Sequence, residues 1–154
     1  PGAIPGRGAI VAQFGRGRNA LRVVVLHLAL GRRARFQQLR YVAHLVAAHP
    51  YVVVMGDLNA GPDSRELREF REHSGLVLPD RRPNTFPSWQ PQRAIDHILL
   101  SPAMTVLDYQ ALPARLSDHL AVAIRIELPD DVSLQRHAHG DSEQEDTEGS
   151  RKAG

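Results

Sequence analysis

The stretch that decides the fold is YVVVMGDLN, residues 51–59. Its first part, rich in β-branched valine, is typical of a strand buried on both faces of a sheet. Asp57 and Asn59 follow, and their side chains face the same way if the extended conformation continues. A carboxylate beside an amide suits a hard cation and a phosphate oxygen, or a positioned water. Taken alone, these residues are more typical of the turn that ends a strand.

The sequence on both sides of this stretch alternates between strand and helix patterns. An amphipathic helix is predicted over residues 33–48, and a shorter helix over residues 64–72 with Ser64 as its N-cap. Strands are predicted over residues 9–14, 21–28, 51–55, 95–100, 106–112 and 120–128, with a hairpin turn at residues 15–20. The fold class is therefore α/β or α+β, with sheets covered by helices.

The composition is that of a globular domain: 154 residues, 42% hydrophobic and 23% charged. No apolar run is long enough to span a bilayer, and 0 cysteines exclude disulfides and thiolate metal sites. A cytoplasmic location is the default expectation. The net charge is +2, and an acidic C-terminal stretch leaves the rest of the chain more basic. A basic domain suits an anionic substrate such as a phosphodiester, although the abundance of arginine fits a codon bias equally well.

Three segments are predicted along the chain. Residues 1–8 are rich in proline and glycine and are expected to be a disordered start. Residues 9–128 carry the strand and helix patterns and form the domain. Residues 129–154 have no apolar period and are expected to be a disordered acidic tail.

A second motif, AIDHILL at residues 94–100, places a carboxylate in an apolar strand. Asp96 requires a partner if it is buried, and the adjacent His97 points to the opposite strand face. His119 is a suitable partner, because a carboxylate fixes the tautomer of an imidazole. The alternative is that Asp96 lies on a solvated strand edge.

A third motif, LSDHL at residues 116–120, contains Asp118 and His119 at the start of the last predicted strand. Asp118 is a candidate metal ligand. The alternative is a Ser-Asp turn before a strand. His27, within the apolar strand 21–28, is a fourth candidate, although a lone histidine there is more often a satisfied core residue.

The loop at residues 79–93 combines Phe86 and Trp89 with arginines that include Arg93. An aromatic ring beside an arginine can stack on a base or flank a phosphate, which makes Trp89 and Arg93 candidate substrate-binding residues. The alternative is that the two aromatic rings pack as a lid on the core.

These four motifs, in this order, resemble the endonuclease/exonuclease/phosphatase superfamily. Members include apurinic-site endonucleases, pancreatic-type deoxyribonucleases, neutral sphingomyelinases and inositol polyphosphate 5-phosphatases. The segment NTFPSW at residues 84–89 also looks like the family's Thr-Phe/Tyr-Pro-x-Trp segment. The resemblance covers about residues 7–128 and implies part of a four-layer α/β/β/α sandwich.

The resemblance implies a phosphoesterase that uses Mg²⁺ or Mn²⁺ and an activated water in in-line attack. Asp57 and Asn59 match the residues that position this water and hold the scissile phosphate. His27 matches a histidine that stabilises the developing charge, although the residue before it is Leu26 where the family often has threonine.

The remaining matches complete the implied active site. Asp118 matches an aspartate that ligates or orients the metal. His119 matches a histidine that contacts the phosphate or acts as base, and Asp96 matches the aspartate that pairs with it. The substrate class stays open between nucleic acid, a lipid headgroup and a small phosphoester.

The first half of the family's domain has no counterpart among these motifs. That half supplies an asparagine and a metal-binding glutamate in a Gln-Glu pair, and the only Gln-Glu pair here is in the acidic tail. One sheet is therefore expected to be largely present and the N-terminal half missing. The sequence is then an incomplete gene model, a truncated homologue, or a half that pairs with another chain. The alternative is a catalytically inactive remnant that acts as a nucleic-acid or protein binding module.

Overall fold

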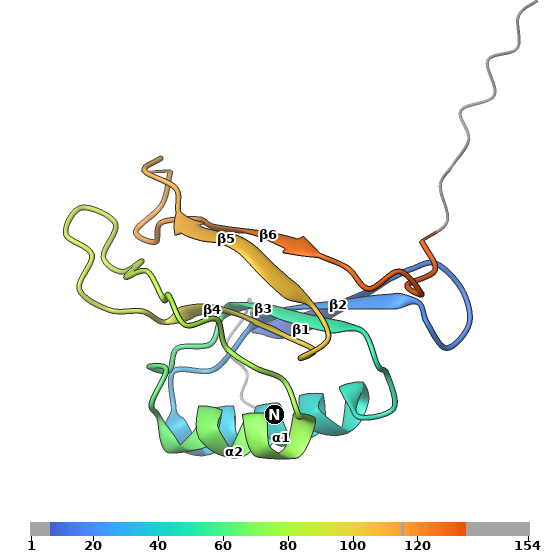
Figure 1. Cartoon of the computed structure of the whole chain (residues 1–154). Coiled ribbons are helices and arrows are strands. Elements are labelled where there is room, and N and C mark those ends of the chain that lie inside the picture. The colour runs from blue at the N-terminus through green and yellow to red at the C-terminus, as the bar shows by residue number, and fades with distance from the viewer. Residues whose placement is uncertain (1–6, 115, 135–154) are drawn as a thin grey trace, which may run out of the picture.

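The computed structural model describes residues 7–114 and 116–134, which form three layers (Figure 1). Two helices cover one face of a four-stranded sheet, and a two-stranded sheet lies over the other face. The elements are β1 (Gly8–Phe14), β2 (Leu21–His27), α1 (Arg32–Val46), β3 (Val52–Asp57), α2 (Arg65–Ser74), β4 (Asp96–Leu100), β5 (Thr105–Ala111) and β6 (Val122–Glu127). The predicted α/β class is confirmed.

The larger sheet is mixed, in the order β1-β2-β3-β4. β2 and β3 are parallel, and α1 provides the crossover that a parallel pair needs. β1 and β4 are antiparallel to their neighbours and form the two edges. The tight β1–β2 hairpin uses glycine in the left-handed region, with φ of 89° at Gly15 and 73° at Gly17.

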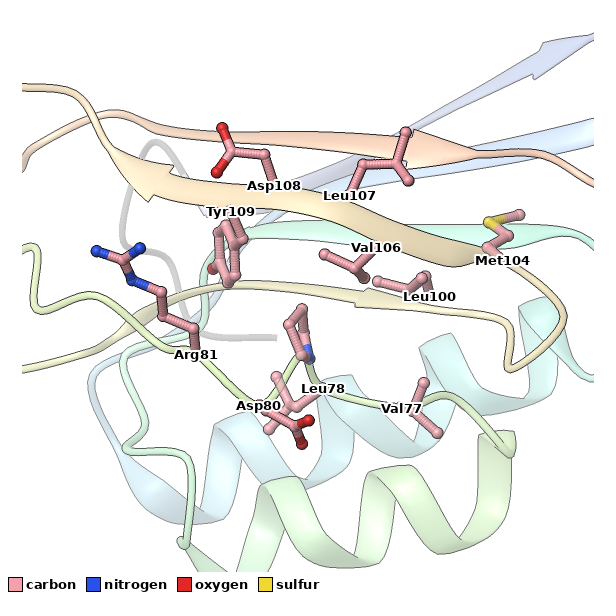
Figure 2. Close-up of a pocket in the computed structure, with 11 residues that line it drawn as sticks. Val77, Leu78, Asp80, Arg81, Leu100, Met104, Val106, Leu107, Asp108 and Tyr109 are labelled. Carbon is pink, nitrogen blue, oxygen red and sulfur yellow. The ribbon is translucent and has the colours of Figure 1, made fainter.

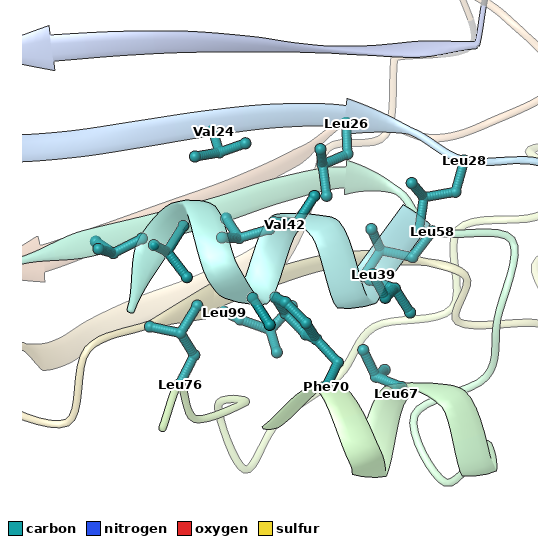
Figure 3. Close-up of a cluster of buried hydrophobic side chains, with 14 of the residues drawn as sticks. Val24, Leu26, Leu28, Leu39, Val42, Leu58, Leu67, Phe70, Leu76 and Leu99 are labelled. Carbon is teal, nitrogen blue, oxygen red and sulfur yellow. The ribbon is translucent and has the colours of Figure 1, made fainter. Parts of the chain in front are cut away.

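The helix face of this sheet carries the main core. Alternate residues of β2 and β3 point toward α1 and α2, as the β-strand period of two requires. Figure 3 shows α1, which carries Leu39 and Val42, between the strand that carries Val24 and the helix α2 that carries Phe70. Leu99 of β4 belongs to the same cluster. All five side chains are almost completely buried.

A buried ion pair links α1 to α2. Arg35 of α1 places Nη2 at 2.6 Å from Oε1 of Glu66 on α2, and it also donates to the carbonyl oxygens of Ala29 and Leu30. Burial acts to raise the pKa of Glu66, but its hydrogen bond from Arg35 and the nearby positive charges outweigh it, and the pKa is lowered. Glu66 is therefore ionised and paired with Arg35.

The opposite face of the sheet packs against β5 and β6. Tyr51, Val53 and Ile98 belong to this second core, and Tyr109 of β5 reaches it from the other sheet. The segment that follows β6 also contacts the hairpin end of the larger sheet: Asn19 of the hairpin turn donates to Asp131 at 3.1 Å, and Tyr51, just before β3, donates its hydroxyl to the same carboxylate at 2.6 Å. The later part of the predicted acidic tail, and most of the predicted disordered start, lie outside the described residues.

Part of this face is uncovered in the described part of the chain. Ile10 of β1 is 70% exposed, and its strand partner Val25 of β2 is 43% exposed. Phe14, at the end of β1, is half exposed as well. Large apolar side chains grouped on one sheet face are typical of a contact surface. Neither helix among the described residues combines the length and apolar character of a membrane span.

Candidate active site

Four strands present aligned ends at one edge of the larger sheet. Gly8 pairs with His27, His27 with Asp57, and Asp57 with Asp96, in a row that crosses from β1 to β4. Directly paired residues project from the same sheet face. The side chains of His27, Asp57 and Asp96 therefore point to the face that packs against β5 and β6 further along the strands. His27 is 47% exposed at its side chain, so its interpretation as a core histidine is wrong.

A cavity of about 570 Å³ lies over this row. It brings together seven of the residues expected from the sequence: His27, Asp57, Asn59, Arg93, Asp96, Asp118 and His119. Trp89 does not line this cavity, and it is 62% exposed, so it is not a lid on the core. Arg7 also lines the cavity, and its sequence position just before the first strand gave no functional signal by itself.

The pairing of Asp96 with His119 is present. His119 Nδ1 lies 2.8 Å from Asp96 Oδ2, and the Asp96 side chain is only 12% exposed, so it is not on a solvated edge. If Nδ1 carries the proton, Nε2 is left as an acceptor toward the cavity. The same Asp96 oxygen accepts a hydrogen bond from Thr85, which is completely buried. Thr85 thus fixes the carboxylate that orients the imidazole.

The segment that contains Thr85 also holds the loop that carries His119. Ser88 donates its backbone N–H to Asp118 O at 2.7 Å and its hydroxyl to Ser117 O at 2.6 Å. The Phe86 ring packs against His119, with the ring centroids 4.9 Å apart. The position of His119 therefore depends on a segment about thirty residues earlier, which the motif itself does not reveal.

Asp57 and Asn59 form a compact pair after β3. The extended conformation does not continue, because Asn59 has φ of 50°, in the left-handed region. Their side chains still meet: Asn59 donates from its backbone N–H to Asp57 Oδ1 at 2.8 Å and from Nδ2 to Asp57 Oδ2 at 3.1 Å. A second bond from Asn59 Nδ2 to Leu28 O, at 2.9 Å, anchors the amide to the end of β2.

Two further residues fix this turn. Gly56 has φ of 134°, and a Cβ there would lie 2.0 Å from Leu26 O of the adjacent strand, so only glycine fits. His97 places Nε2 at 2.8 Å from Ala60 O, just beyond Asn59. Burial is the largest influence on His97 and lowers its pKa, so the ring is neutral and can donate this bond.

Asp57, Asp96 and His119 could hold a metal ion, since one ligand atom of each lies within 4.8 Å of the others. Carboxylate oxygens are the ligands that Mg²⁺ and Mn²⁺ prefer. Asp96 Oδ2 already accepts hydrogen bonds from Thr85 and His119, so Asp96 would offer its Oδ1 to a cation, and each Asp57 oxygen keeps a second lone pair. The donor set therefore fits a hard divalent cation. Asp118 lines the same cavity with an exposed side chain, but it is not part of this three-residue cluster.

A second cleft, of about 420 Å³, lies between β5 and the loop that follows α2. Figure 2 shows Val106 and Tyr109 pointing into it from β5, with Arg81 on the loop side. Burial raises the pKa of Tyr109 to about 12, so its phenol is neutral near pH 7. This cleft lacks the convergent carboxylates and imidazoles of the first cavity.

Residues 4–119 match the Endonuclease/Exonuclease/phosphatase family, and the chain belongs to this family. Members of the family hydrolyse phosphoester bonds. The comparison with curated proteins found no sequence match.

Solved structures of this fold are similar to the chain at low sequence identity. A functionally unknown conserved protein from Enterococcus faecalis V583 has a TM-score of 0.65 and 17% identity, over 84% of this chain and 61% of that one. D. rerio TDP2 complexed with single-strand DNA product has a TM-score of 0.62 and 18% identity, over 79% of this chain and 62% of that one. The 5-phosphatase domain of SpSynaptojanin, complexed with inositol (1,4)-bisphosphate and calcium, has a TM-score of 0.62 and 20% identity, over 82% and 52%. The chain thus spans 52–62% of the length of these proteins.

Proposed function

We propose that the protein is a divalent-metal-dependent phosphoesterase that cleaves a phosphodiester or phosphomonoester by in-line attack of water. The observation that carries this proposal is the cavity in which the Asp96–His119 pair faces the Asp57–Asn59 pair. Membership of a phosphoesterase family supports the same reaction class. Endonuclease-like cleavage of nucleic acid is one form of this activity.

The cavity residues that the sequence singled out have proposed roles in this reaction. Asp57 and Asn59 position the attacking water and the scissile phosphate. His119, oriented by Asp96, contacts the phosphate or accepts the proton of the water while the bond from phosphorus to the leaving oxygen breaks. His27 stabilises the negative charge that develops on the phosphoryl oxygens.

A bound Mg²⁺ or Mn²⁺ would neutralise charge on the phosphate and on the leaving oxygen. Asp118 is proposed as its ligand, and the cluster of Asp57, Asp96 and His119 offers the alternative ligand set. Metal affinities of Asp118→Ala and Asp57→Ala, measured by calorimetry with Mn²⁺, would separate the two assignments, because only the true ligand set loses affinity.

The substrate side of the proposal involves the loop before β4. Arg93 lies with its guanidinium carbon 5.7 Å from the Phe86 ring centroid and lines the cavity, so it is proposed to contact the substrate together with Asn59. Trp89, exposed on the same loop, is proposed to contact a larger substrate outside the cavity. The DNA product in one similar structure and the inositol bisphosphate in another support nucleic acid and small phosphoesters as candidate substrates, and a lipid headgroup is the third candidate.

The proposal also includes a second segment, the other half of the domain, which would cover the exposed apolar side chains of the larger sheet. Ile10, Phe14 and Val25 leave an apolar area on the sheet face that elsewhere packs against β5 and β6. Such an area suits the half of the domain that the longer similar structures contain. The activity of the chain by itself is therefore expected to be low and to rise when that half is supplied.

Hydrolysis of bis-p-nitrophenyl phosphate and p-nitrophenyl phosphate, with Mg²⁺, with Mn²⁺ and with EDTA, tests the proposal. His119→Ala should lower the rate by at least about 100-fold, since general base catalysis contributes that much. His73→Ala is the matched control, because His73 is exposed on α2, does not line the cavity, and has its ring nitrogen on the backbone oxygen of Glu69. Turnover that needs no metal, or that survives in His119→Ala, would exclude the mechanism. Salt-sensitive nucleic-acid binding without turnover would favour a binding module instead.

A further inference from the structure

Arg7 occupies a position in the cavity that the roles above leave unused. It directly precedes Gly8, the first residue of β1, and Gly8 pairs with His27 at the end of β2. Arg7 therefore lies at the same end of the sheet as the row of His27 and Asp57, and it lines the cavity with them.

Arg7 is partly buried, and two of its three guanidinium nitrogens lack a partner in the described part of the chain. Its Nε and Nη1 atoms are buried, and neither has a hydrogen-bond partner among the described residues. None of the ion pairs in this part of the chain includes Arg7. A buried donor of a charged group that is left unpaired is costly, so a folded protein normally supplies a partner for it.

Arg35 is a buried arginine with a structural role, and its hydrogen bonds can be compared with those of Arg7. Its guanidinium is bonded to Glu66 and to two backbone carbonyl oxygens. Arg7 has no equivalent set in the described residues, although Asp57 lines the same cavity. The Asp57 carboxylate accepts hydrogen bonds from Asn59 instead. The missing partner of Arg7 is therefore expected to be an anion that enters the cavity.

We infer that Arg7 is a substrate-binding residue that donates hydrogen bonds to a non-bridging oxygen of the substrate's phosphoryl group. This inference rests on the proposed function. Guanidinium groups match phosphate oxygens in charge and in planar donor geometry. Arg93 does not duplicate this role, because its guanidinium lies over the Phe86 ring. Arg7 recognises the phosphate itself, whatever group the phosphate carries.

Calorimetric binding of inorganic phosphate to the full chain, in EDTA so that no metal contributes, tests this inference. Arg7→Gln should weaken the phosphate affinity by about 10- to 100-fold, the value of a hydrogen bond to a charged group. Arg7→Lys, which keeps the charge but loses the planar donors, should lie between Arg7→Gln and the unchanged protein. Arg18→Gln is the matched control, because Arg18 is exposed in the hairpin at the opposite end of β2.

A melting experiment separates substrate binding from a structural role. Without phosphate, Arg7→Gln should melt at the same temperature as the unchanged protein or higher, because an unpaired buried donor has been removed. Added phosphate should raise the melting temperature of the unchanged protein and of Arg18→Gln, but not that of Arg7→Gln. A lower melting temperature for Arg7→Gln without phosphate would indicate a structural role and overturn the inference.

The inference and the proposed function can fail separately. If phosphate binding depends on Arg7 but no phosphoester is hydrolysed under any metal condition, even when the other half of the domain is supplied, the inference is supported and the proposed function is contradicted. Equal phosphate affinities of Arg7→Gln and Arg18→Gln, or no phosphate binding by the unchanged protein, overturn the inference even if hydrolysis is observed.

Discussion

Thr85→Val tests directly how the chain fixes its Asp96–His119 pair. Thr85 is completely buried, and its hydroxyl donates to the same Asp96 oxygen that accepts from His119 Nδ1. Valine has nearly the same shape, so the change removes the hydroxyl and leaves no large cavity. Loss of a hydrogen bond to a charged group costs about 1.5–3 kcal/mol, and the additional buried methyl returns about 0.8 kcal/mol. The free energy of unfolding should therefore fall by about 1–2 kcal/mol.

The same change should also lower catalysis if the proposed function is correct. Without the Thr85 hydroxyl, the Asp96 carboxylate can rotate, and it then orients the His119 ring less firmly. We expect kcat to fall about tenfold, the lower end for residues that orient an active-site group, with a smaller change in KM. Urea unfolding and hydrolysis of p-nitrophenyl phosphate measure the two effects. Thr105→Val, at an exposed position in β5, is the control. If both variants unfold at the same urea concentration, the hydrogen bond from Thr85 has no energetic role and the reasoning is refuted.

Two further predictions concern the turn after β3. Gly56→Ala should lower the free energy of unfolding by about 3 kcal/mol, because it combines φ of 134° with a Cβ only 2.0 Å from a backbone oxygen. Gly61→Ala, where a Cβ meets nothing within 4 Å, should be nearly neutral, and similar urea midpoints for the two variants would contradict this explanation. Burial lowers the pKa of His97 in the folded protein, so below about pH 6.5 the unfolded chain takes up a proton that the native state excludes. Stability should therefore fall as the pH drops through this range. In urea unfolding between about pH 7.5 and about pH 5, the free energy of unfolding of His97→Gln should fall less steeply with decreasing pH than that of the unchanged protein. If the two slopes are equal, His97 does not cause the pH dependence.

The strands and helices were predictable from the sequence because each has a local cause. The valine-rich segment of β3 and the apolar spacing of α1 depend on side-chain patterns that repeat every two or every 3.6 residues. Ser64 was predicted as the N-cap of α2, and its side chain does accept a hydrogen bond from Leu67 N. The need of Asp96 for a partner also follows from local sequence, since it is a carboxylate among apolar residues.

The partners of these residues could not be predicted with the same certainty, because they come from distant parts of the chain. Nothing in the sequence around Thr85 shows that its hydroxyl would reach Asp96, and nothing around Glu66 shows that it would be buried against Arg35. The other positions of the helix that carries Glu66 are mainly charged. Burial of this one side chain depends on how α2 packs against α1.

The sequence by itself determined which segments become strands and helices, and which ionisable residues stand at strand ends, because those properties depend on neighbours within a few positions. Only the tertiary structure decided that Arg7, His27, Asp57 and Asp96 share one edge, since that alignment comes from the pairing register of four separate strands. A shift of one residue in any of these pairings would turn a side chain to the opposite face of the sheet. The cavity is therefore a product of strand register, which no single motif encodes.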